Sequence, residues 1–463
     1  MSSLYIPRSY QSECLGVLDH TRKIGKKTAL VVMATGLGKT VTAALDVKKW
    51  LEENPGEKVL YLCHLNHVLE KSLETFQHTI GGSPNSYGYY NGLSKLRDAS
   101  FMFSSFQTMQ GALERFRREE FGYIVVDESH HSQAETFRPV IDYFRPKFLT
   151  AITATPERGD LRDIREIYGQ EVFDLPLEEA LARQLLAPID YNLVTDEIVD
   201  IGEIKSPERL SLSDLNKRIF VPKRDEEIKR IIDRKIVESG IVDPKILTFC
   251  SSIAHANRLV KGVMSDALPL HSGIPARLHR DIVHGFQESA VPNLVTVNQF
   301  NEGVDFPDVN VIIFLRPTQS RTIFYQQLGR GLRLKEGGGK VLVLDFAGNC
   351  QRIEMIYELA RLVNVERERA QKEKQDLEIE AARLAPDIAL PSASAFNAVG
   401  FNFNEKVIDI LDVLKKARQG YTSEALIEQL KAEAELLGRT PGLKEINLAS
   451  REGRTASAPV FSR

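Results

Sequence analysis

The sequence predicts an α/β protein with two domains in series, each built on a mostly parallel sheet. Short apolar runs alternate with helix-length segments, and strands that are buried on both faces of a parallel sheet have such a sequence. A charged stretch, residues 160–244, interrupts the alternation, which then starts again. The length of 463 residues allows about three domains at ~150 residues each, and 43% hydrophobic residues are enough for sizeable cores.

The first series opens with a helix from residues 7–11 onwards, followed by a small basic cluster at residues 22–27 that we interpret as solvated surface. The strands of this series are predicted at residues 29–32, 59–64, 101–105, 123–126 and 148–152. Helices are predicted from near Lys39 and over residues 65–76 and 107–116. The stretch 160–244 is charged and reads as irregular apart from a helix over residues 176–186.

The second series repeats the same alternation. Its strands are predicted at residues 245–249, 268–271, 294–297, 309–314 and 341–345, and its helices at residues 250–264, 275–287 and 323–332. Residues 351–385 are helix-prone and densely charged without a sustained apolar heptad, which indicates a solvated helix. A linker rich in Ser, Ala and Pro precedes a last helical segment, residues 405–437, which Gly438 ends.

These patterns predict five parts of the chain. The boundaries are residues 1–160 for the first sheet domain, 161–243 for a connector, 244–350 for the second sheet domain, 351–420 for the charged helix and linker, and 421–463 for a small helical module.

The composition restricts the class of protein. The four cysteines lie far apart without a CxxC pair, which disfavours a zinc site or a disulfide framework and fits a reducing cytoplasm. The N-terminus lacks a signal pattern, and no apolar run approaches the ~20 residues of a membrane span, so we expect a soluble, cytoplasmic protein. A formal net charge of −3 does not indicate nucleic-acid binding, and any such binding must therefore use a local groove.

The segment Ala34–Thr40, which reads ATGLGKT, lies between a predicted strand and a predicted helix. In that context the backbone N–H groups and the positive end of the helix dipole point at one anion, which makes a phosphate cradle. The side chain of Lys39 would reach the β- and γ-phosphates of a nucleotide, and Thr40 would ligate magnesium. The pattern GxxxxGK[ST] is met only in part, because Met33 stands where its first glycine belongs, and a glycine-rich turn before an ordinary helix is the alternative.

Two carboxylates, Asp127 and Glu128, follow the apolar run that ends at Val126. Hydrolysis of a magnesium nucleotide uses such a pair: one carboxylate holds the metal, and the next orients and deprotonates the attacking water. A strand that ends in two acidic residues is also a common surface feature. The phosphate cradle upstream favours the catalytic interpretation.

With these motifs in place, the chain resembles a superfamily 2 helicase of the DEAD/DEAH-like group, close to DNA helicases and the motor subunits of restriction enzymes. Nine segments match the family's motifs in family order: residues 7–11, 34–40, 62–65, 104–108, 127–130, 153–156, 247–251, 301–305 and 326–333. The resemblance implies two tandem RecA-like parallel-sheet domains with a helical C-terminal extension, and ATP and Mg²⁺ as ligands.

The resemblance also implies roles for individual residues. Arg330 and Arg333 would lie three residues apart on a helix of the second domain and stabilise charge on a nucleotide held by the first, so that hydrolysis is coupled to domain motion. The implied ATP-binding residues are Gln11 on the adenine, Thr35, Gly36, Leu37, Gly38, Lys39 and Thr40 in the loop, and Gly303 and Asp305. The implied coupling residues are His130, Thr153, Thr155 and Gln326, with a structural role for His130 equally open. The implied nucleic-acid contacts are Ser105, Gln107, Thr108 and Ser251.

Nucleic acid in this family is held mainly through its backbone, by groups that do not raise the net charge, which agrees with a mildly acidic chain. The TATP spelling of residues 153–156, where RNA-directed members have SAT, favours DNA as the partner. We therefore expect an ATP-dependent DNA helicase or translocase. A non-unwinding motor subunit of a restriction or defence complex, with the nuclease on another chain, stays open, as do an RNA helicase and a nucleotide-binding structural protein.

The C-terminal region has two interpretations. Residues 426–441 resemble the start of a repeat found beside homing endonucleases, which implies a small DNA-contacting module, and a generic helical tail is the alternative. The sequence contains no recognisable nuclease motif. The connector and the segment Phe396–Phe403 are candidates for a strand-separating wedge, and the family suggests 3′ to 5′ movement.

Overall fold

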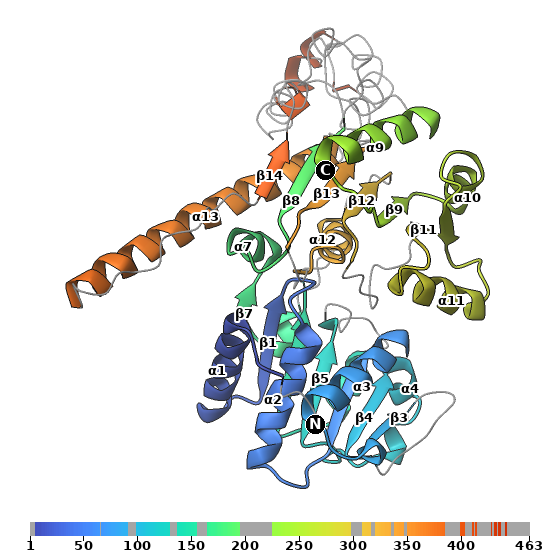
Figure 1. Ribbon diagram of the computed structural model, residues 1–463. Coiled ribbons are helices and arrows are strands. Elements are labelled where there is room, and N and C mark those ends of the chain that lie inside the picture. The colour runs from blue at the N-terminus through green and yellow to red at the C-terminus, as the bar shows by residue number, and fades with distance from the viewer. Residues whose placement is uncertain are drawn as a thin grey trace. The chain divides into compact units, whose positions relative to one another are not determined.

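The structure is a computed structural model of the chain (Figure 1). It describes residues 5–64, 66–90, 99–129, 137–154, 164–194, 225–297, 308–315, 320–334, 338–346, 350–384 and 399–402, with isolated positions between 410 and 441. The chain divides into two compact units. Unit 1 contains Met1–Leu186, Phe300–Pro307 and Ser320–Glu336, and unit 2 contains Ala187–Gln299, Asp308–Gln319 and Gly337–Arg463.

Unit 1 is built on a sheet of seven strands in the order β3-β4-β2-β5-β6-β1-β7. All neighbouring strands are parallel. The strands are β1 (Thr28–Met33), β2 (Val59–Cys63), β3 (Tyr87–Tyr90), β4 (Phe101–Ser105), β5 (Tyr123–Asp127), β6 (Phe148–Thr153) and β7 (Glu171–Leu175). Every residue of β2, β4, β5 and β6 is buried, as expected for central strands that are covered on both faces.

Helices cover this sheet (Figure 1). They are α1 (Ser9–Lys23), α2 (Lys39–Glu53), α3 (Asn66–Ile80), α4 (Phe106–Gln110), α5 (Arg138–Tyr143) and α6 (Arg165–Tyr168). Two further helices, α7 (Leu177–Ala182) and α12 (Arg321–Gly329), also belong to unit 1. Successive side chains of each strand point to opposite faces of the sheet. On β2, Leu60 and Leu62 join the apolar core that includes α4 and α5, whereas Tyr61 points to the other face and packs on Phe76 of α3.

Unit 2 repeats the architecture with a second sheet of seven parallel strands in the order β10-β11-β9-β12-β13-β8-β14. The strands are β8 (Ile189–Leu193), β9 (Ile246–Cys250), β10 (Ala267–Leu270), β11 (Asn293–Val297), β12 (Val311–Phe314), β13 (Val341–Asp345) and β14 (Val399–Asn402). The helices are α9 (Asp225–Ser239), α10 (Ile253–Gly262), α11 (Ala276–Gln287) and α13 (Cys350–Leu384).

The start of α13 is attached to this sheet by a buried ion pair. Arg352 is fully buried and donates through Nε to Asp345, at the end of β13, over 2.8 Å. Tyr191 of β8 donates to the same carboxylate, and the guanidinium lies over the ring of Phe314. A buried carboxylate needs such partners, because burial alone raises its pKa.

The predicted pair of parallel-sheet domains is confirmed, and the structure corrects several details. The described residues of the stretch 160–244 are not irregular: they supply β7 to the first sheet, β8 to the second, and α9. Strands β3 and β14 were not predicted from the sequence either. The helix expected over residues 323–332 ends at Gly329, so Arg330 and Arg333 follow the helix rather than lying on it. The module expected at residues 421–463 lies outside the described residues, apart from isolated positions.

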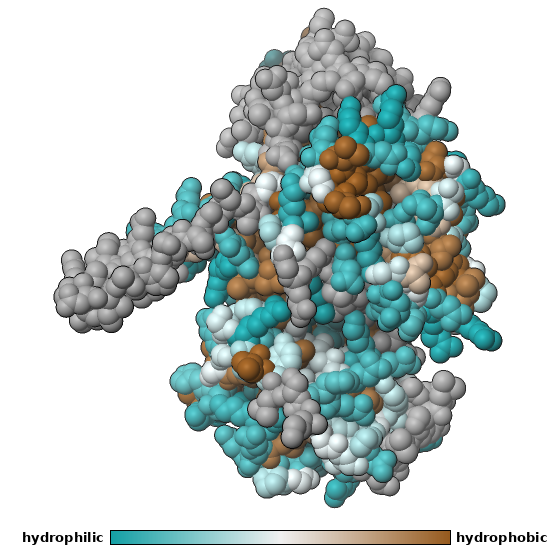
Figure 2. All heavy atoms as spheres, viewed as in Figure 1, coloured by the Kyte–Doolittle hydropathy of each residue, from teal (hydrophilic) through white to brown (hydrophobic). Residues whose placement is uncertain are grey.

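The outer faces of the helices meet water. Figure 2 shows mainly hydrophilic residues on the visible surface around α2 and α3. Within the described part of the chain, no helix is both long and apolar enough to cross a membrane.

Candidate active site

The loop between β1 and α2 has the geometry of an anion-binding turn. Gly36 and Gly38 have φ angles of +94° and +79°, a left-handed conformation that glycine adopts without the steric cost of a Cβ. Gly38 is also the N-cap residue of α2, and no side chain caps that helix. The first N–H groups of α2 are therefore not satisfied by a capping side chain, which suits a helix N-terminus that binds phosphate.

The loop is closely packed against two other segments of unit 1. A Cβ on Gly38 would lie 3.1 Å from Nε2 of Gln11, and a Cβ on Gly36 would lie 3.1 Å from the carbonyl oxygen of Gly329. A Cβ on Gly329, at the end of α12, would lie only 2.7 Å from the Cβ of Thr35. These contacts bring the end of α12, and the arginines that follow it, to the loop.

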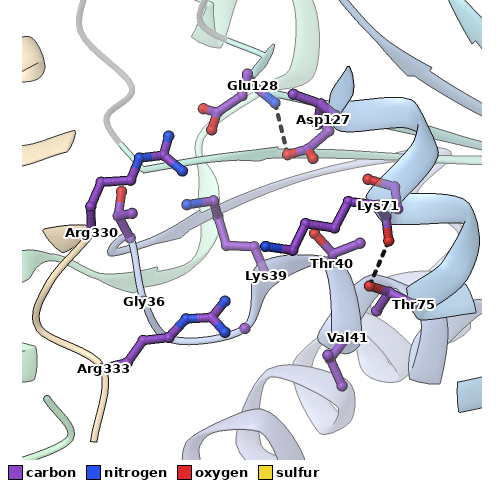
Figure 3. A pocket seen from close by; sticks show the side chains of 14 residues that line it. Gly36, Lys39, Thr40, Val41, Lys71, Thr75, Asp127, Glu128, Arg330 and Arg333 are labelled. Carbon is purple, nitrogen blue, oxygen red and sulfur yellow. Dashed lines mark hydrogen bonds between the residues drawn. The ribbon is translucent and has the colours of Figure 1, made fainter. Parts of the chain in front are cut away.

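A cavity of about 190 Å³ lies beside the loop (Figure 3). Its walls come from the loop and the start of α2, from α3, from the end of β5 and from the segment after α12. The lining residues are Thr35, Gly36, Gly38, Lys39, Thr40, Val41, Val68, Lys71, Ser72, Thr75, Asp127, Glu128, Arg330 and Arg333. Figure 3 shows the side chains of Lys39, Lys71, Arg330 and Glu128 directed towards a common space.

The acidic pair occupies the carboxyl end of β5. Asp127 is the last residue of the strand, and Glu128 turns away with a φ of +50°. The Glu128 backbone N–H donates to Oδ1 of Asp127 over 2.9 Å. Burial and the neighbouring charge of Glu128 raise the pKa of Asp127, whereas the Tyr61 hydroxyl and Lys39 act in the opposite direction. An ionised Asp127 is therefore costly unless a cation neutralises it.

Tyr61 is a part of this site that the sequence analysis did not identify. It is buried in β2, beside β5, and its hydroxyl donates to Oδ2 of Asp127. Ser72 of α3 donates in turn to the Tyr61 oxygen over 3.1 Å. Burial raises the pKa of Tyr61 well above its ordinary value, so the phenol keeps its proton and acts as a donor.

Gln11 supports the loop from outside the cavity. Its Oε1 accepts from the N–H of Arg8 over 2.9 Å, and its Nε2 donates to Oγ1 of Thr42 over 3.3 Å. The hydroxyl of Tyr10 donates to the carbonyl oxygen of Leu37 over 3.0 Å, and Leu37 is a buried residue of the loop. The start of α1 therefore holds the loop and α2 in position, and Gln11 is not among the residues that line the cavity.

The remaining predicted residues lie away from the cavity or outside the described residues. Thr153 is buried at the end of β6, and Gln326 is buried in α12. Ser105 is the N-cap of α4, where its Oγ accepts from the Thr108 N–H over 3.2 Å, and Gln107 beside it is exposed. Ser251 follows β9 in unit 2 and is exposed. The residues outside the described part of the chain are His130, Thr155, Gly303 and Asp305.

The donor set around the cavity fits a magnesium nucleotide. Mg²⁺ keeps several waters and is bound through one or two carboxylates together with substrate phosphates, rather than by a cage of protein ligands. Thr40 and Asp127 supply a hydroxyl and a carboxylate on the cavity wall. Among the described residues, no group of three or more His, Cys, Asp or Glu side chains could hold a metal ion.

Comparison with known proteins gives two family matches. Residues 4–158 match the family described as type III restriction enzyme, res subunit, and residues 226–335 match the helicase conserved C-terminal domain. The first match includes the loop and the acidic pair, and the second includes Arg330 and Arg333.

Two curated relatives extend these matches over most of the chain. The first is IRC3 of Saccharomyces cerevisiae, assigned as an ATP-dependent helicase, which is 25% identical and covers 74% of this chain and 51% of its own length. The second is the type I restriction enzyme EcoAI endonuclease subunit of Escherichia coli, which is 23% identical and covers 73% of this chain and 46% of its own length. The chain thus spans about half the length of these relatives.

A solved structure shares the fold. It is a fragment assigned as the HsdR subunit of a type I restriction enzyme from Vibrio vulnificus YJ016, with a TM-score of 0.56 and 22% identity. The likeness covers 75% of this chain and 65% of that one. The two sheets are therefore the tandem RecA-like domains that the resemblance implied.

Proposed function

The chain belongs to superfamily 2 of the helicases, and we propose that it hydrolyses ATP and uses the energy to move along DNA or to unwind it. One observation carries the proposal: a single cavity is lined by the loop residues Lys39 and Thr40, by the acidic pair Asp127 and Glu128, and by Arg330 beside them. Chemical groups for binding phosphate, holding a metal and activating water are thus gathered in one place.

In this proposal the loop and the start of α2 hold the phosphates through backbone N–H groups and Lys39. Thr40 and Asp127 hold magnesium, which neutralises negative charge on the phosphates. Glu128 orients a water molecule and accepts its proton. Glu128 lines the same cavity as Asp127 and is only 9% exposed, so bulk water does not screen its charge strongly.

Arg330 and Arg333 stabilise charge on the phosphoryl group that is transferred. Arginines in this role are worth about 10³ to 10⁵ in rate. Both side chains line the cavity from the segment that follows α12. Their proximity to the loop supports the assignment, because Gly329 packs directly on Thr35.

We assign the parts of the chain to this function as follows. Residues 1–160 and 244–350 form most of the two motor domains, residues 161–243 connect them and add β7 to the first sheet and β8 to the second, and residues 351–420 and 421–463 are additions. Gln11, Gly303 and Asp305 complete the nucleotide site, and His130, Thr153, Thr155 and Gln326 couple it to motion. Ser105, Gln107, Thr108 and Ser251 contact DNA. The DEAH-like spelling at residues 127–130 supports an enzyme of the DEAD/DEAH-like group, and the buried thiols of Cys14 and Cys250 support a cytoplasmic location.

The experiment that tests the function is a steady-state ATPase assay. ATP hydrolysis is measured without nucleic acid, with single-stranded DNA, with forked duplex DNA and with RNA, and Glu128→Gln is the blank. We expect stimulation by DNA that disappears in the variant. Hydrolysis that survives Glu128→Gln would contradict the proposed site, and stimulation by RNA alone would exclude DNA as the partner.

A second candidate function is that of a non-unwinding motor subunit in a restriction complex. The match of residues 4–158 to a restriction-enzyme family and the relationship to the EcoAI subunit favour it. Here a partner chain supplies the nuclease. Purification of the native protein distinguishes the two candidates, because a stoichiometric nuclease partner supports the subunit and its absence supports a stand-alone enzyme.

A further inference from the structure

One face of α3 forms a wall of the cavity beside the loop. Val68, Lys71, Ser72 and Thr75 all line the cavity. Their spacing of three, four and seven residues places them on a single face of the helix. The carboxylates of this helix lie elsewhere, since Glu70 and Glu74 are exposed.

The orientation of α3 is determined by packing. Phe76 is fully buried and makes edge contacts with the rings of Tyr61 and Phe103 in the sheet. Ser72 donates to the Tyr61 oxygen over 3.1 Å. Lys48 of α2 donates to the carbonyl oxygen of Thr79 over 3.4 Å. These contacts hold the helix against both the sheet and α2, so the face with Lys71 is directed at the cavity.

Lys71 extends into the cavity from the wall opposite the arginines. Figure 3 shows its side chain reaching from α3 towards Lys39 and Thr40, whereas Arg330 and Arg333 enter from the other side. Its backbone carbonyl accepts a hydrogen bond from Thr75 Oγ1 over 2.8 Å, which leaves the Thr75 hydroxyl on the wall beside it.

The balance of charge favours an anionic ligand at this wall. The cavity is lined by four cationic side chains and two carboxylates, an excess of two positive charges. A nucleoside triphosphate with one magnesium ion carries two negative charges. These two charges balance the positive excess of the cavity when Lys71 is counted among its cations. Lysine suits the role, because its ammonium is a compact charge on a flexible stem that follows a phosphate group.

We propose that Lys71 is a further phosphate-binding residue of this site, which contacts the polyphosphate from the α3 side while Lys39 and the loop hold it from below. The inference rests on the proposed function, because it takes the cavity to be the nucleotide site. It assigns a specific task to a residue that lies outside the helicase motifs identified in the sequence.

The test is nucleotide affinity in the intact chain. A non-hydrolysable ATP analogue with a fluorescent label on the ribose is titrated, with magnesium, against the original protein and four variants. The variants are Lys71→Met, which removes the charge, Lys71→Arg, which keeps it, Lys49→Met, a surface control on α2 whose ammonium lies 3.2 Å from Asp19, and Lys39→Ala, a reference for the site itself. Unfolding in urea is measured for each variant.

We expect Lys71→Met to weaken binding of the analogue about tenfold or more, since hydrogen bonds to charged groups are worth about that factor. Lys71→Arg restores most of the affinity and Lys49→Met leaves it unchanged. A structural role for Lys71 would instead lower stability in urea without this rescue by arginine.

The outcomes separate the two proposals. If Lys39→Ala weakens binding and Lys71→Met does not, the inference about Lys71 is wrong and the nucleotide site stands. If Lys39→Ala also leaves the affinity unchanged, the nucleotide is bound elsewhere and the proposed function itself is contradicted.

Discussion

Tyr61 donates its phenolic hydrogen to the carboxylate of Asp127, from one strand of the first sheet to the next. The bond opposes the effect of burial, because it lowers the pKa of Asp127, whereas burial and Glu128 raise it. A carboxylate must be ionised to hold a metal. The phenol therefore helps to keep Asp127 ready for magnesium at neutral pH.

Replacing Tyr61 by Phe removes this donor, and we expect the pKa of Asp127 to rise further. The acid side of the pH–rate profile for ATP hydrolysis then moves to higher pH, and the rate recovers at alkaline pH. The matched control is Tyr87→Phe, which removes a 2.6 Å hydrogen bond to Gly81 elsewhere in unit 1. Both variants should lose about 0.5–1.5 kcal/mol of stability, but an unshifted profile for Tyr61→Phe would exclude the role in ionisation.

Gly329→Ala tests the contact between α12 and the loop. The added Cβ would lie 2.7 Å from the Cβ of Thr35, so the two segments must separate, and we expect a loss of about 1–3 kcal/mol and a lower rate of ATP hydrolysis. Gly262→Ala is the control, because it also ends a helix and its Cβ would meet nothing within 4 Å. This control should stabilise the protein by about 0.4–1 kcal/mol. Equal changes in the free energy of unfolding of the two variants, measured by urea denaturation, would show that Gly329 and Thr35 are not closely packed.

A buried ion pair between α1 and α2 offers a test of stability alone. Arg22 donates two hydrogen bonds of 2.9 Å to Asp46, which is fully buried and also accepts from the hydroxyl of Tyr123. Removal of one partner of such a pair costs about 3–5 kcal/mol, so Asp46→Ala should lower the free energy of unfolding by this amount. The exposed pair of Arg138 and Asp142 supplies the control, since Asp142→Ala should cost less than about 1 kcal/mol. Similar losses of unfolding free energy in Asp46→Ala and Asp142→Ala would mean that water screens the pair of Arg22 and Asp46.

Much of the fold and part of the site could be predicted from the sequence. Central strands of a parallel sheet are apolar throughout, so β1, β2, β5 and β6 are recognisable as runs. Strands β7 and β8 were missed because they alternate: Asp174 is exposed between buried neighbours on β7, and β8 alternates buried and half-buried residues. Such alternation occurs where a strand is not covered on both faces.

The loop residues and the acidic pair follow strands directly, and their spacing alone predicts that they meet at one edge of the sheet. Tyr61 and Lys71 could not be found in this way. Tyr61 looks like any core aromatic residue in an apolar strand, and Lys71 looks like a solvated position on an amphipathic helix. Their roles depend on tertiary packing, namely on the rotation of α3 that the contact between Phe76 and Tyr61 sets.

Asp127→Asn connects the chemistry of the site to its stability. The folded-state pKa of Asp127 lies above the ordinary value of 3.8, mainly because of burial. For a raised pKa, the contribution to stability is complete below the unfolded value and is lost as the pH rises through the folded value. At neutral pH the ionised carboxylate therefore weakens the ligand-free protein.

We expect Asp127→Asn to abolish ATP hydrolysis, yet to raise the free energy of unfolding at neutral pH. The gain should shrink as the pH falls towards 3.8, the ordinary value for this group, because the Asp127 carboxyl of the original protein then becomes protonated in the unfolded as well as in the folded state. Urea denaturation across this pH range measures the effect, and Asp142→Asn, an exposed residue, serves as the control. A variant that is less stable than the original protein at neutral pH would mean that Lys39 and Tyr61 already compensate the charge of Asp127 without a metal.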